Sequence, residues 1–424
     1  MKRNITKVAG TLLALIILLP FADLKAADIE RPEEIKSKRL VVYDIDTYKK
    51  LAEKWKAYNE AYPSEYAYAN WMYAARYAGD NNYSDLMHAG LNKYPSNPTL
   101  LYLRGIEHLG GQDIMEERKF LEKSIALDPS STDPWFAIVG NYMNGGEDEK
   151  VDVALRKILE SGIITDEVMD YCYNMMAGMD KNGVLITNGD NDTYPVWIMQ
   201  RILNIRPDIS IINRSLLNTD WYPIYVIEHG APSFITKAEL DNLREAIIKR
   251  MKAGDVGISA PGPFSDTLIF KIIESADKAG RPVYFSNTLY RTGRVKDLAD
   301  KGRDLGLINL VTSPRTSYAN QLRGVYGAWL NDFRTAGLDS WRLRFSSEGD
   351  AGRQLITNYA SALKDNLDSL KIYAPDLRTG LFHWYLDHLD KTLNDEHRTY
   401  MRKVWCAQSD IKEIKDWCKQ KGIE

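Results

Sequence analysis

The stretch from residue 183 to residue 222 restricts the fold of this chain more than any other, because it has the pattern of a βαβ unit. Two apolar runs, at residues 184–187 and 210–217, flank a short amphipathic helix, and each run ends in a small polar cluster. A βαβ unit joins neighbouring parallel strands, so both clusters are expected at one edge of a sheet, where open α/β sheets bind ligands. The sequence predicts where a site would lie, but not which reaction, if any, it performs.

The first polar cluster supplies half of the candidate ligand-binding residues, namely Asn188, Asp190, Asn191, Asp192 and Thr193. Two carboxylates in a D-x-D pattern could chelate a hard cation through their oxygens. The competing interpretation is structural, because Asp192 or Thr193 can cap the helix that follows, and Gly189 suits a tight turn. We favour caps and turns over a ligand site, and a ligand site over a metal site. No metal and no cofactor are predicted.

The other candidates follow the second strand and a later one: Asn218, Asp220, Trp221, Asn287 and Arg291. Asp220 would cap a helix or point into the crevice beside Asp190. Trp221 would stack on a sugar or pack in the core. Arg291 would be the counter-ion of an acidic ligand or a solvated loop residue. Catalytic residues are not predicted, since the sequence has no G-x-S-x-G elbow, H-E-x-x-H motif or P-loop.

Residues 27–180 have the pattern of consecutive helices with a tetratricopeptide-like repeat. Pro95 and Pro129 close two helical patterns 34 residues apart, which is the period of that repeat. Asp133, followed by proline, is a helix start and opens a further unit. Such units bury their apolar faces by stacking, so we expect a solenoid whose concave face holds a peptide or protein.

Residues 181–315 alternate strands with helices, and residues 316–424 return to helices. Further strands are predicted at residues 256–260, 281–286 and 307–312, and an exposed helix at residues 236–252 with Thr236 and Glu239 as its capping pair. The predicted fold class is α/β plus all-α. A tetratricopeptide-like solenoid precedes a mostly parallel, Rossmann-like sheet, and C-terminal helices pack on that sheet.

Four strings in the middle segment carry a resemblance to a known family: TNGDNDTYPVWIMQ, RPDISIINRSLLNTDWY, DTLIFKIIESADKAGRPVYFSNT and LGLINLVTSP. Over residues 165–315 they resemble the soluble part of bacterial membrane proteins grouped with protein O-mannosyltransferase-like glycosyltransferases. That part also occurs in exported proteins joined to tetratricopeptide repeats. This chain has no multi-span catalytic part, so the resemblance implies an envelope protein whose α/β domain has a ligand or partner, and not the glycosyl-transfer activity itself.

The first 26 residues have the pattern of a secretory signal peptide. Lys2 and Arg3 precede a short apolar run, and small residues near Ala26 suit a cleavage site. An uncleaved anchor is the alternative, although the run is short for a membrane span. We therefore predict a periplasmic protein without a membrane span after cleavage. The formal net charge of −3 gives no basic excess that would hold nucleic acid.

The three cysteines leave two alternatives open. Cys406 and Cys418 lie on a predicted helical hairpin and could form a disulfide in an exported protein, with Cys172 left over. Alternatively, all three are buried free thiols.

Two functions from different classes remain. The first is a non-catalytic envelope binding or assembly protein, with a protein or peptide partner on the repeats and a small polar ligand or glycan at the strand ends. The alternative is an enzyme that acts on envelope glycans through Asp190, Asp192 and Asp220. In a third and weaker interpretation, the polar clusters only shape turns in a scaffold.

Overall fold

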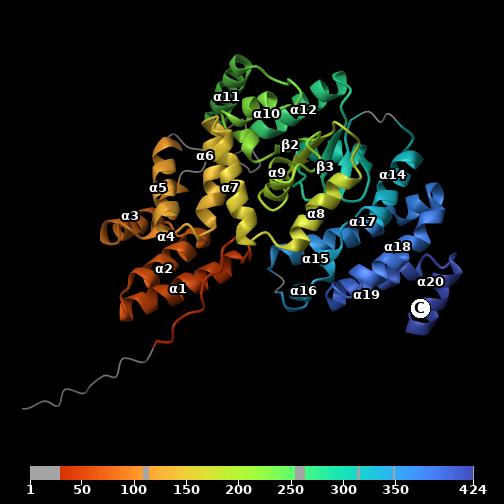
Figure 1. Cartoon of the computed structure of the whole chain (residues 1–424), viewed down its shortest axis with the longest axis horizontal. Coiled ribbons are helices and arrows are strands. Elements are labelled where there is room, and N and C mark those ends of the chain that lie inside the picture. The colour runs from red at the N-terminus through yellow and green to blue at the C-terminus, as the bar shows by residue number, and fades with distance from the viewer. Residues whose placement is uncertain (1–28, 108–113, 254–262, 313–315, 347–348, 424) are drawn as a thin grey trace, which may run out of the picture.

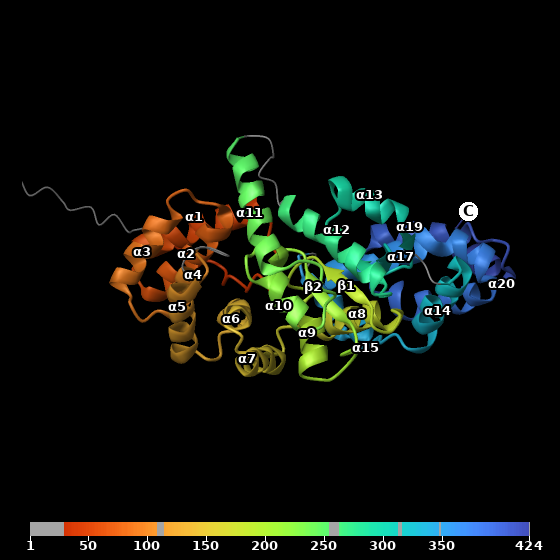
Figure 2. The same ribbon diagram turned by 90° about the horizontal axis from the view of Figure 1, so that it is seen from above.

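The computed structural model describes residues 29–107, 114–253, 263–312, 316–346 and 349–423. Three parts lie in a row: N-terminal helices, a small sheet with its covering helices, and C-terminal helices (Figures 1 and 2). Residues 1–28, which include the predicted signal peptide, and the predicted strand at residues 256–260 lie outside the described residues. No helix in the described ranges is both long and apolar enough to cross a membrane.

The N-terminal part is built from paired helices. They are α1 (Ile45–Ala61), α2 (Glu65–Ala78), α3 (Tyr83–Lys93), α4 (Pro98–Gly105), α5 (Ile114–Leu127), α6 (Asp133–Asn144) and α7 (Asp148–Ser161). Helices α2, α4 and α6 begin at residues 65, 98 and 133, each packs on the helix that follows it, and α4 also contacts α2 and α6. We call the surface formed by α2, α4 and α6 the inner face.

Two glycines allow neighbouring helices of this part to approach closely. A Cβ on Gly105 would lie 2.6 Å from Cγ of Leu121, and one on Gly90 would overlap the ring of Tyr68. Gly105 lies 24 residues before Pro129, which is the spacing between the small position and the terminal proline of a tetratricopeptide repeat. The helical part of the fold prediction therefore agrees with the structure, with close helix–helix packing at this glycine.

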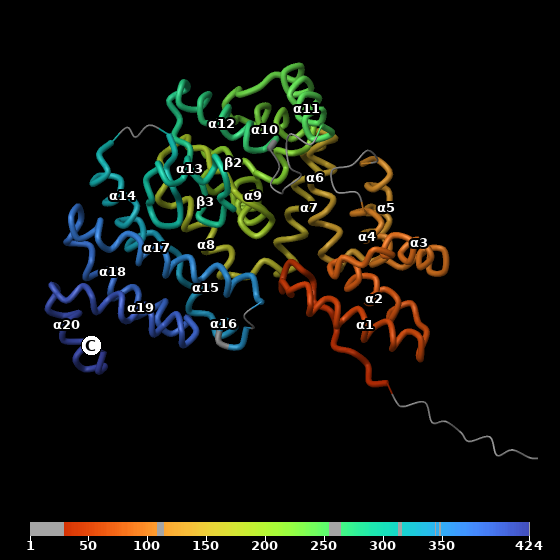
Figure 3. The backbone as a smooth tube through the Cα atoms, turned by 180° about the vertical axis from the view of Figure 1, so that it is seen from behind, coloured from red at the N-terminus to blue at the C-terminus, as the bar shows by residue number. Residues whose placement is uncertain are grey.

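An extended N-terminal segment, residues 29–44, runs along the inner face before α1 begins. The backbone N–H of Lys38 donates to the hydroxyl of Tyr73 at 3.1 Å, and the hydroxyl of Ser37 donates to Asp133 at 2.5 Å. Its far end reaches the C-terminal part, where the N–H of Val42 donates to the carbonyl of Gly349 at 2.9 Å. Figure 3 shows this red segment arriving beside α15 and α16, so it joins the N-terminal part to the C-terminal part.

A five-stranded sheet forms the centre, in the order β2-β1-β3-β5-β4. The strands are β1 (Val184–Thr187), β2 (Ser210–Asn213), β3 (Val283–Ser286), β4 (Arg303–Asp304) and β5 (Ile308–Leu310). Strand β1 pairs in parallel with β2, Val184 opposite Ser210, and with β3, Val184 opposite Val283. All residues of β1 and β3 are buried, as expected for strands covered on both faces.

The sheet is mixed, so the prediction of a mostly parallel sheet is wrong on one side. Strand β5 runs antiparallel to both β3 and β4. The reason is a tight hairpin between β4 and β5, in which Gly306 has a φ of 89° that other residues rarely adopt. A hairpin reverses the chain without a crossover helix, whereas a parallel strand needs one.

Six helices belong to the central part: α8 (Asp166–Ala177), α9 (Tyr194–Arg201), α10 (Tyr222–Glu228), α11 (Lys237–Lys252), α12 (Pro263–Lys278) and α13 (Gly293–Lys301). Helix α9 connects β1 to β2, which is the predicted βαβ unit. The predicted capping box of α11 is confirmed, because Thr236 accepts from the N–H of Glu239 and the Glu239 carboxylate accepts from the N–H of Thr236.

The C-terminal part packs mainly on α8. Its helices are α14 (Tyr318–Asn331), α15 (Ala336–Asp339), α16 (Trp341–Phe345), α17 (Ala351–Tyr373), α18 (Arg378–Trp384), α19 (Asp395–Cys406) and α20 (Lys412–Lys421), with a π-helical turn at Tyr385–Leu389. Asn174 of α8 donates to the hydroxyl of Tyr359 at 2.8 Å, which ties α8 to α17. A disulfide joins Cys406 to Cys418, and Cys172 is a buried free thiol, so the first of the two cysteine alternatives holds.

Candidate functional site

The polar cluster after β1 lies against the last residue of β2 and the turn that follows it. The Asn213 amide, at the end of β2, donates to the carbonyl of Gly189 at 3.3 Å and to the hydroxyl of Thr193 at 2.9 Å. The hydroxyl of Ser215 donates to the carbonyl of Asn188 at 2.9 Å. The strand ends thus form one connected polar edge, in the place that the strand pattern predicted.

Asp192 organises the loop after β1 from inside the protein. Only 3% of the residue is exposed, and its carboxylate accepts from the backbone N–H groups of Asn188 and Gly189, both at 2.8 Å. The hydroxyls of Ser286 and Thr288, at and after the end of β3, also donate to it. These bonds saturate the carboxylate, so Asp192 stabilises the turn after β1. Thr193 is also fully buried, and its hydroxyl pairs with Thr187 at 2.7 Å.

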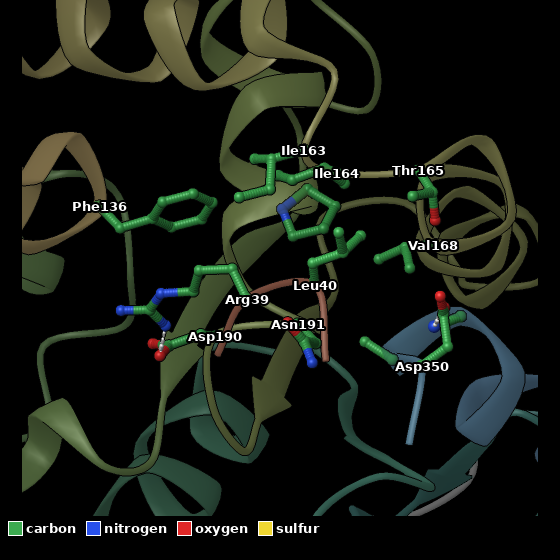
Figure 4. Close-up of a pocket in the computed structure, with 13 residues that line it drawn as sticks. Arg39, Leu40, Phe136, Ile163, Ile164, Thr165, Val168, Asp190, Asn191 and Asp350 are labelled. Atoms are coloured by element: carbon green, nitrogen blue, oxygen red, sulfur yellow. Dashed lines mark hydrogen bonds and ion pairs between the residues drawn. The ribbon is translucent and has the colours of Figure 1, made fainter. Parts of the chain in front are cut away.

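Asp190 and Asn191 face outward from the same loop. The Asp190 carboxylate forms an ion pair with Arg39 of the N-terminal segment, and its side chain keeps 49% exposure. The Arg39 guanidinium also lies 4.8 Å from the ring centre of Phe136 on α6, so it sits between the helical part and the strand ends (Figure 4). The apolar cavity beside this pair holds only about 10 Å³, which is too small for a ligand larger than one water molecule.

The second cluster has mostly structural contacts. The Asn218 amide donates to the carbonyl of Ser215 at 3.2 Å, and its side-chain oxygen accepts from the N–H of Ser265 at 3.2 Å. Trp221 is half-buried, with its ring against the surface of α6 at Gly140 and 6.0 Å from the ring of Tyr225. Asp220 is exposed. Asp190 lines both cavities at these strand ends, whereas Asp220 lines neither of them.

Asn287 and Arg291, the candidates after β3, lie at the same edge but do not line the cleft between this edge and the inner face. The side-chain oxygen of Asn287 accepts a hydrogen bond from the hydroxyl of Tyr171 on α8. Burial raises the pKa of Tyr171 well above its ordinary value, so this phenol stays protonated and remains a donor. Arg291 is half-buried, and its Nε atom is enclosed without a hydrogen-bond partner.

Arg214 is a buried charge that the sequence analysis did not select. It follows β2 directly, is 0% exposed, and donates to the Asp266 carboxylate at 2.5 Å and to the carbonyl of Tyr290. A buried guanidinium is stable only with such partners. Arg214 therefore fastens β2 to the start of α12 and to the loop after β3. The available signal was an arginine immediately after an apolar strand in the string NRS.

A cleft of about 470 Å³ opens between the inner face and the strand ends, and this cleft is the candidate site. The helices contribute Arg76, Tyr77, Tyr102 and Gly140; the N-terminal segment contributes Lys38 and Arg39; and the strand ends contribute Gly189, Asp190, Asn191, Asn213 and Ser215. Its volume is within the range of small-molecule sites. Of the predicted site residues, Asp190 and Asn191 line this cleft.

The helical side of the cleft was missed because sequence patterns do not reveal contacts between distant parts of the chain. Arg39 and Asp190 are 151 positions apart.

In the described residues, no group of three or more His, Cys, Asp or Glu side chains is arranged to hold a metal ion.

Comparison with known proteins gives one match. Residues 168–227, from α8 to α10, match the model of the family described as TMEM260-associated domain 2. This segment includes both polar clusters and the βαβ unit, and the match agrees at a coarse level with the resemblance to protein O-mannosyltransferase-like proteins. No curated protein and no solved structure matches the chain.

Proposed function

We propose that this chain is a binding or assembly protein exported to the bacterial cell envelope, which holds a small polar ligand or glycan in the cleft. The observation that supports the proposal is the construction of the cleft. Two parts of different architecture supply its opposite walls, and the exposed polar groups of the loop after β1 point into it. A site between two such parts can couple ligand binding to the way in which they meet.

Export is part of the proposal and depends on the sequence. The charged, apolar and small-residue pattern of residues 1–26 is that of a signal peptide. The disulfide between Cys406 and Cys418 is consistent with an oxidising compartment such as the periplasm.

We further propose that the N-terminal hairpins are tetratricopeptide-like and bind a protein or peptide. The starts of α2, α4 and α6 have nearly the repeat spacing. The N-terminal segment already covers part of the inner face, through the contacts of Ser37 and Lys38. A partner would therefore use the remaining hollow of about 620 Å³, whose lining includes Asn70, Thr99 and Ser131.

The second candidate function is an enzyme that acts on envelope glycans through Asp190, Asp192 and Asp220. Glycoside hydrolysis uses two carboxyl groups on opposite sides of the scissile bond. The Asp192 carboxylate is saturated by loop donors, and that of Asp190 is paired with Arg39. Binding without catalysis therefore accounts better for these residues.

A thermal-shift screen with a cleft-filling variant tests the proposal. Gly140 lies on α6 and lines the cleft, so Gly140→Gln would place a side chain inside it. The matched control is Gly324→Gln on α14, where a Cβ would meet open space outside the cleft. Both substitutions replace a helical glycine and gain similar helix propensity. The screen covers mono- and oligosaccharides, nucleotides, divalent cations and envelope peptides.

A ligand at about 100 times its dissociation constant should stabilise the protein by ~2.7 kcal/mol. We expect this stabilisation in the wild type and in Gly324→Gln, and its loss in Gly140→Gln. A shift that persists in Gly140→Gln would place the ligand elsewhere. If no compound shifts the wild type, the cleft is not a ligand site and the protein-binding function on the helices stands alone.

A further inference from the structure

The wall of the cleft that the N-terminal segment and α2 form carries two cations that, in the described part of the chain, have no carboxylate partner. Lys38 and Arg76 both line the cleft. The Lys38 ammonium lies 4.7 Å from the ring centre of Tyr77, and the Arg76 guanidinium donates to the carbonyl of Ile106 at 2.6 Å. Among the described residues, neither cation has an ion pair with a carboxylate; Lys38 is exposed and Arg76 is half-buried.

The two carboxylates of the cleft already have partners. The Asp133 carboxylate is buried and accepts from the hydroxyl of Ser37 at 2.5 Å and from that of Tyr73 at 2.9 Å. Asp190 is paired with Arg39. With Lys38, Arg39 and Arg76 against Asp133 and Asp190, the cleft lining keeps a net positive charge for a group that enters from outside.

The closeness of these cations to one another affects the pKa of Lys38. Burial lowers the pKa of Lys38, and the nearby guanidinium groups of Arg39 and Arg76 lower it further. An anion between Lys38 and Arg76 would offset both effects, because it favours the charged form of lysine. Its binding should consequently be accompanied by proton uptake near the lowered pKa of Lys38.

The opposite wall has a different chemistry. The loop after β1 contributes Asp190 and Asn191, and the loop after β2 contributes Ser215, all of them at least partly exposed. Carboxylate, amide and hydroxyl groups of this kind form hydrogen bonds with ligand hydroxyls.

We propose that the cleft binds an acidic saccharide, with its carboxylate or phosphate between Lys38 and Arg76 and its hydroxyl groups against the loops after β1 and β2. This inference depends on the proposed ligand-binding function and specifies the class of ligand. Charge-assisted hydrogen bonds to the anion supply affinity, and the polar wall selects a hydroxyl-bearing ring.

Titration calorimetry of the full chain tests the inference with four probes: glucose, glucuronate, glucose 6-phosphate and inorganic phosphate. The variant is Lys38→Gln, which removes one cation from the N-terminal segment. The matched control is Lys237→Gln on α11, where an exposed lysine is paired with Asp241. We expect at least one acidic sugar to bind about ten-fold more tightly than glucose. Lys38→Gln should remove most of this preference, and Lys237→Gln should leave it intact.

The preference should also weaken at higher salt, and binding should take up protons near the lowered pKa of Lys38. Equal binding of glucose and its acidic forms would overturn the inference while leaving the proposed function in place. Inorganic phosphate that binds as tightly as glucose 6-phosphate would overturn the saccharide class. If none of the four probes binds, the inference fails; the proposed function fails with it only if the wider screen also finds no ligand lost in Gly140→Gln.

Discussion

Single residues at the strand ends divide into those that hold the loop and those that face the cleft. Asp192 is turned inward onto backbone N–H groups, whereas Asp190, two positions earlier, is exposed and paired with Arg39. The D-x-D pattern therefore does not form a paired carboxylate site. Asp192 fixes the loop that carries Asp190. The structural interpretation of the sequence therefore applies to Asp192, and the ligand-binding interpretation applies to Asp190.

Because Asp192 stabilises the turn after β1, its substitution should lower the stability of the fold strongly. Asp192→Ala leaves the partly buried N–H groups of Asn188 and Gly189 and the buried hydroxyl of Ser286 without this acceptor, so we expect the free energy of unfolding to fall by about 3 kcal/mol. Asp220→Ala, at an exposed position, should change it by less than about 0.5 kcal/mol. Urea denaturation followed by circular dichroism measures both. Equal effects of the two substitutions would refute the assignment.

Asp208 provides a test by pH. It follows Arg206, which has a φ of 50°, and its hydrogen bonds with the Arg206 side chain lower its pKa from 3.8 to about 2. Because the pKa is lower in the folded state, the carboxylate stabilises the fold above pH 4 and loses this contribution as the pH falls towards 2. The difference in unfolding free energy between wild type and Asp208→Asn should therefore be largest at pH 6 and shrink at pH 3. A difference that is independent of pH would contradict the assignment.

At the scale of elements, local patterns identified what depends on local residues. Apolar runs predicted β1, β2, β3 and β5, and Thr236 with Glu239 predicted the start of α11. The predicted direction of β5 was wrong because that direction depends on a hairpin centred on Gly306. In a sequence, an isolated glycine between apolar residues does not distinguish a hairpin from a longer crossover. The predicted helical hairpin that carries Cys406 and Cys418 corresponds to α19 and α20, and the disulfide joins these two helices.

The disulfide should stabilise this last helical pair. It closes a loop with a sequence separation of 12, for which chain entropy gives roughly 2–3 kcal/mol. We expect Cys406→Ser/Cys418→Ser to lower the melting temperature, and reduction of the wild type to reproduce that value. Cys172→Ser supplies the control for a thiol outside the bond, although it lies in the core. If reductant leaves the wild-type melting temperature unchanged, the bond does not support the fold.

At the scale of the molecule, the N-terminal segment explains why much of the site could not be predicted. This segment joins the inner face to the C-terminal part through the contacts of Lys38 and Val42, and it brings Arg39 to Asp190. These contacts depend on how three parts of the chain assemble, and no periodicity encodes that assembly. The strand-end half of the cleft was predictable from the βαβ unit, whereas the helical half was not.

We propose that the helical half and the strand-end half of the cleft form one ligand site. The most direct test is hydrogen–deuterium exchange of the full chain with and without the compound that gives the largest thermal shift. We predict that the ligand slows exchange in peptides that cover residues 36–42 and in peptides that cover residues 188–191, and that both effects appear at the same ligand concentration. In Gly140→Gln, the ligand should leave exchange in these peptides unchanged. Slower exchange on only one side of the cleft, or equal protection in Gly140→Gln, would contradict the account.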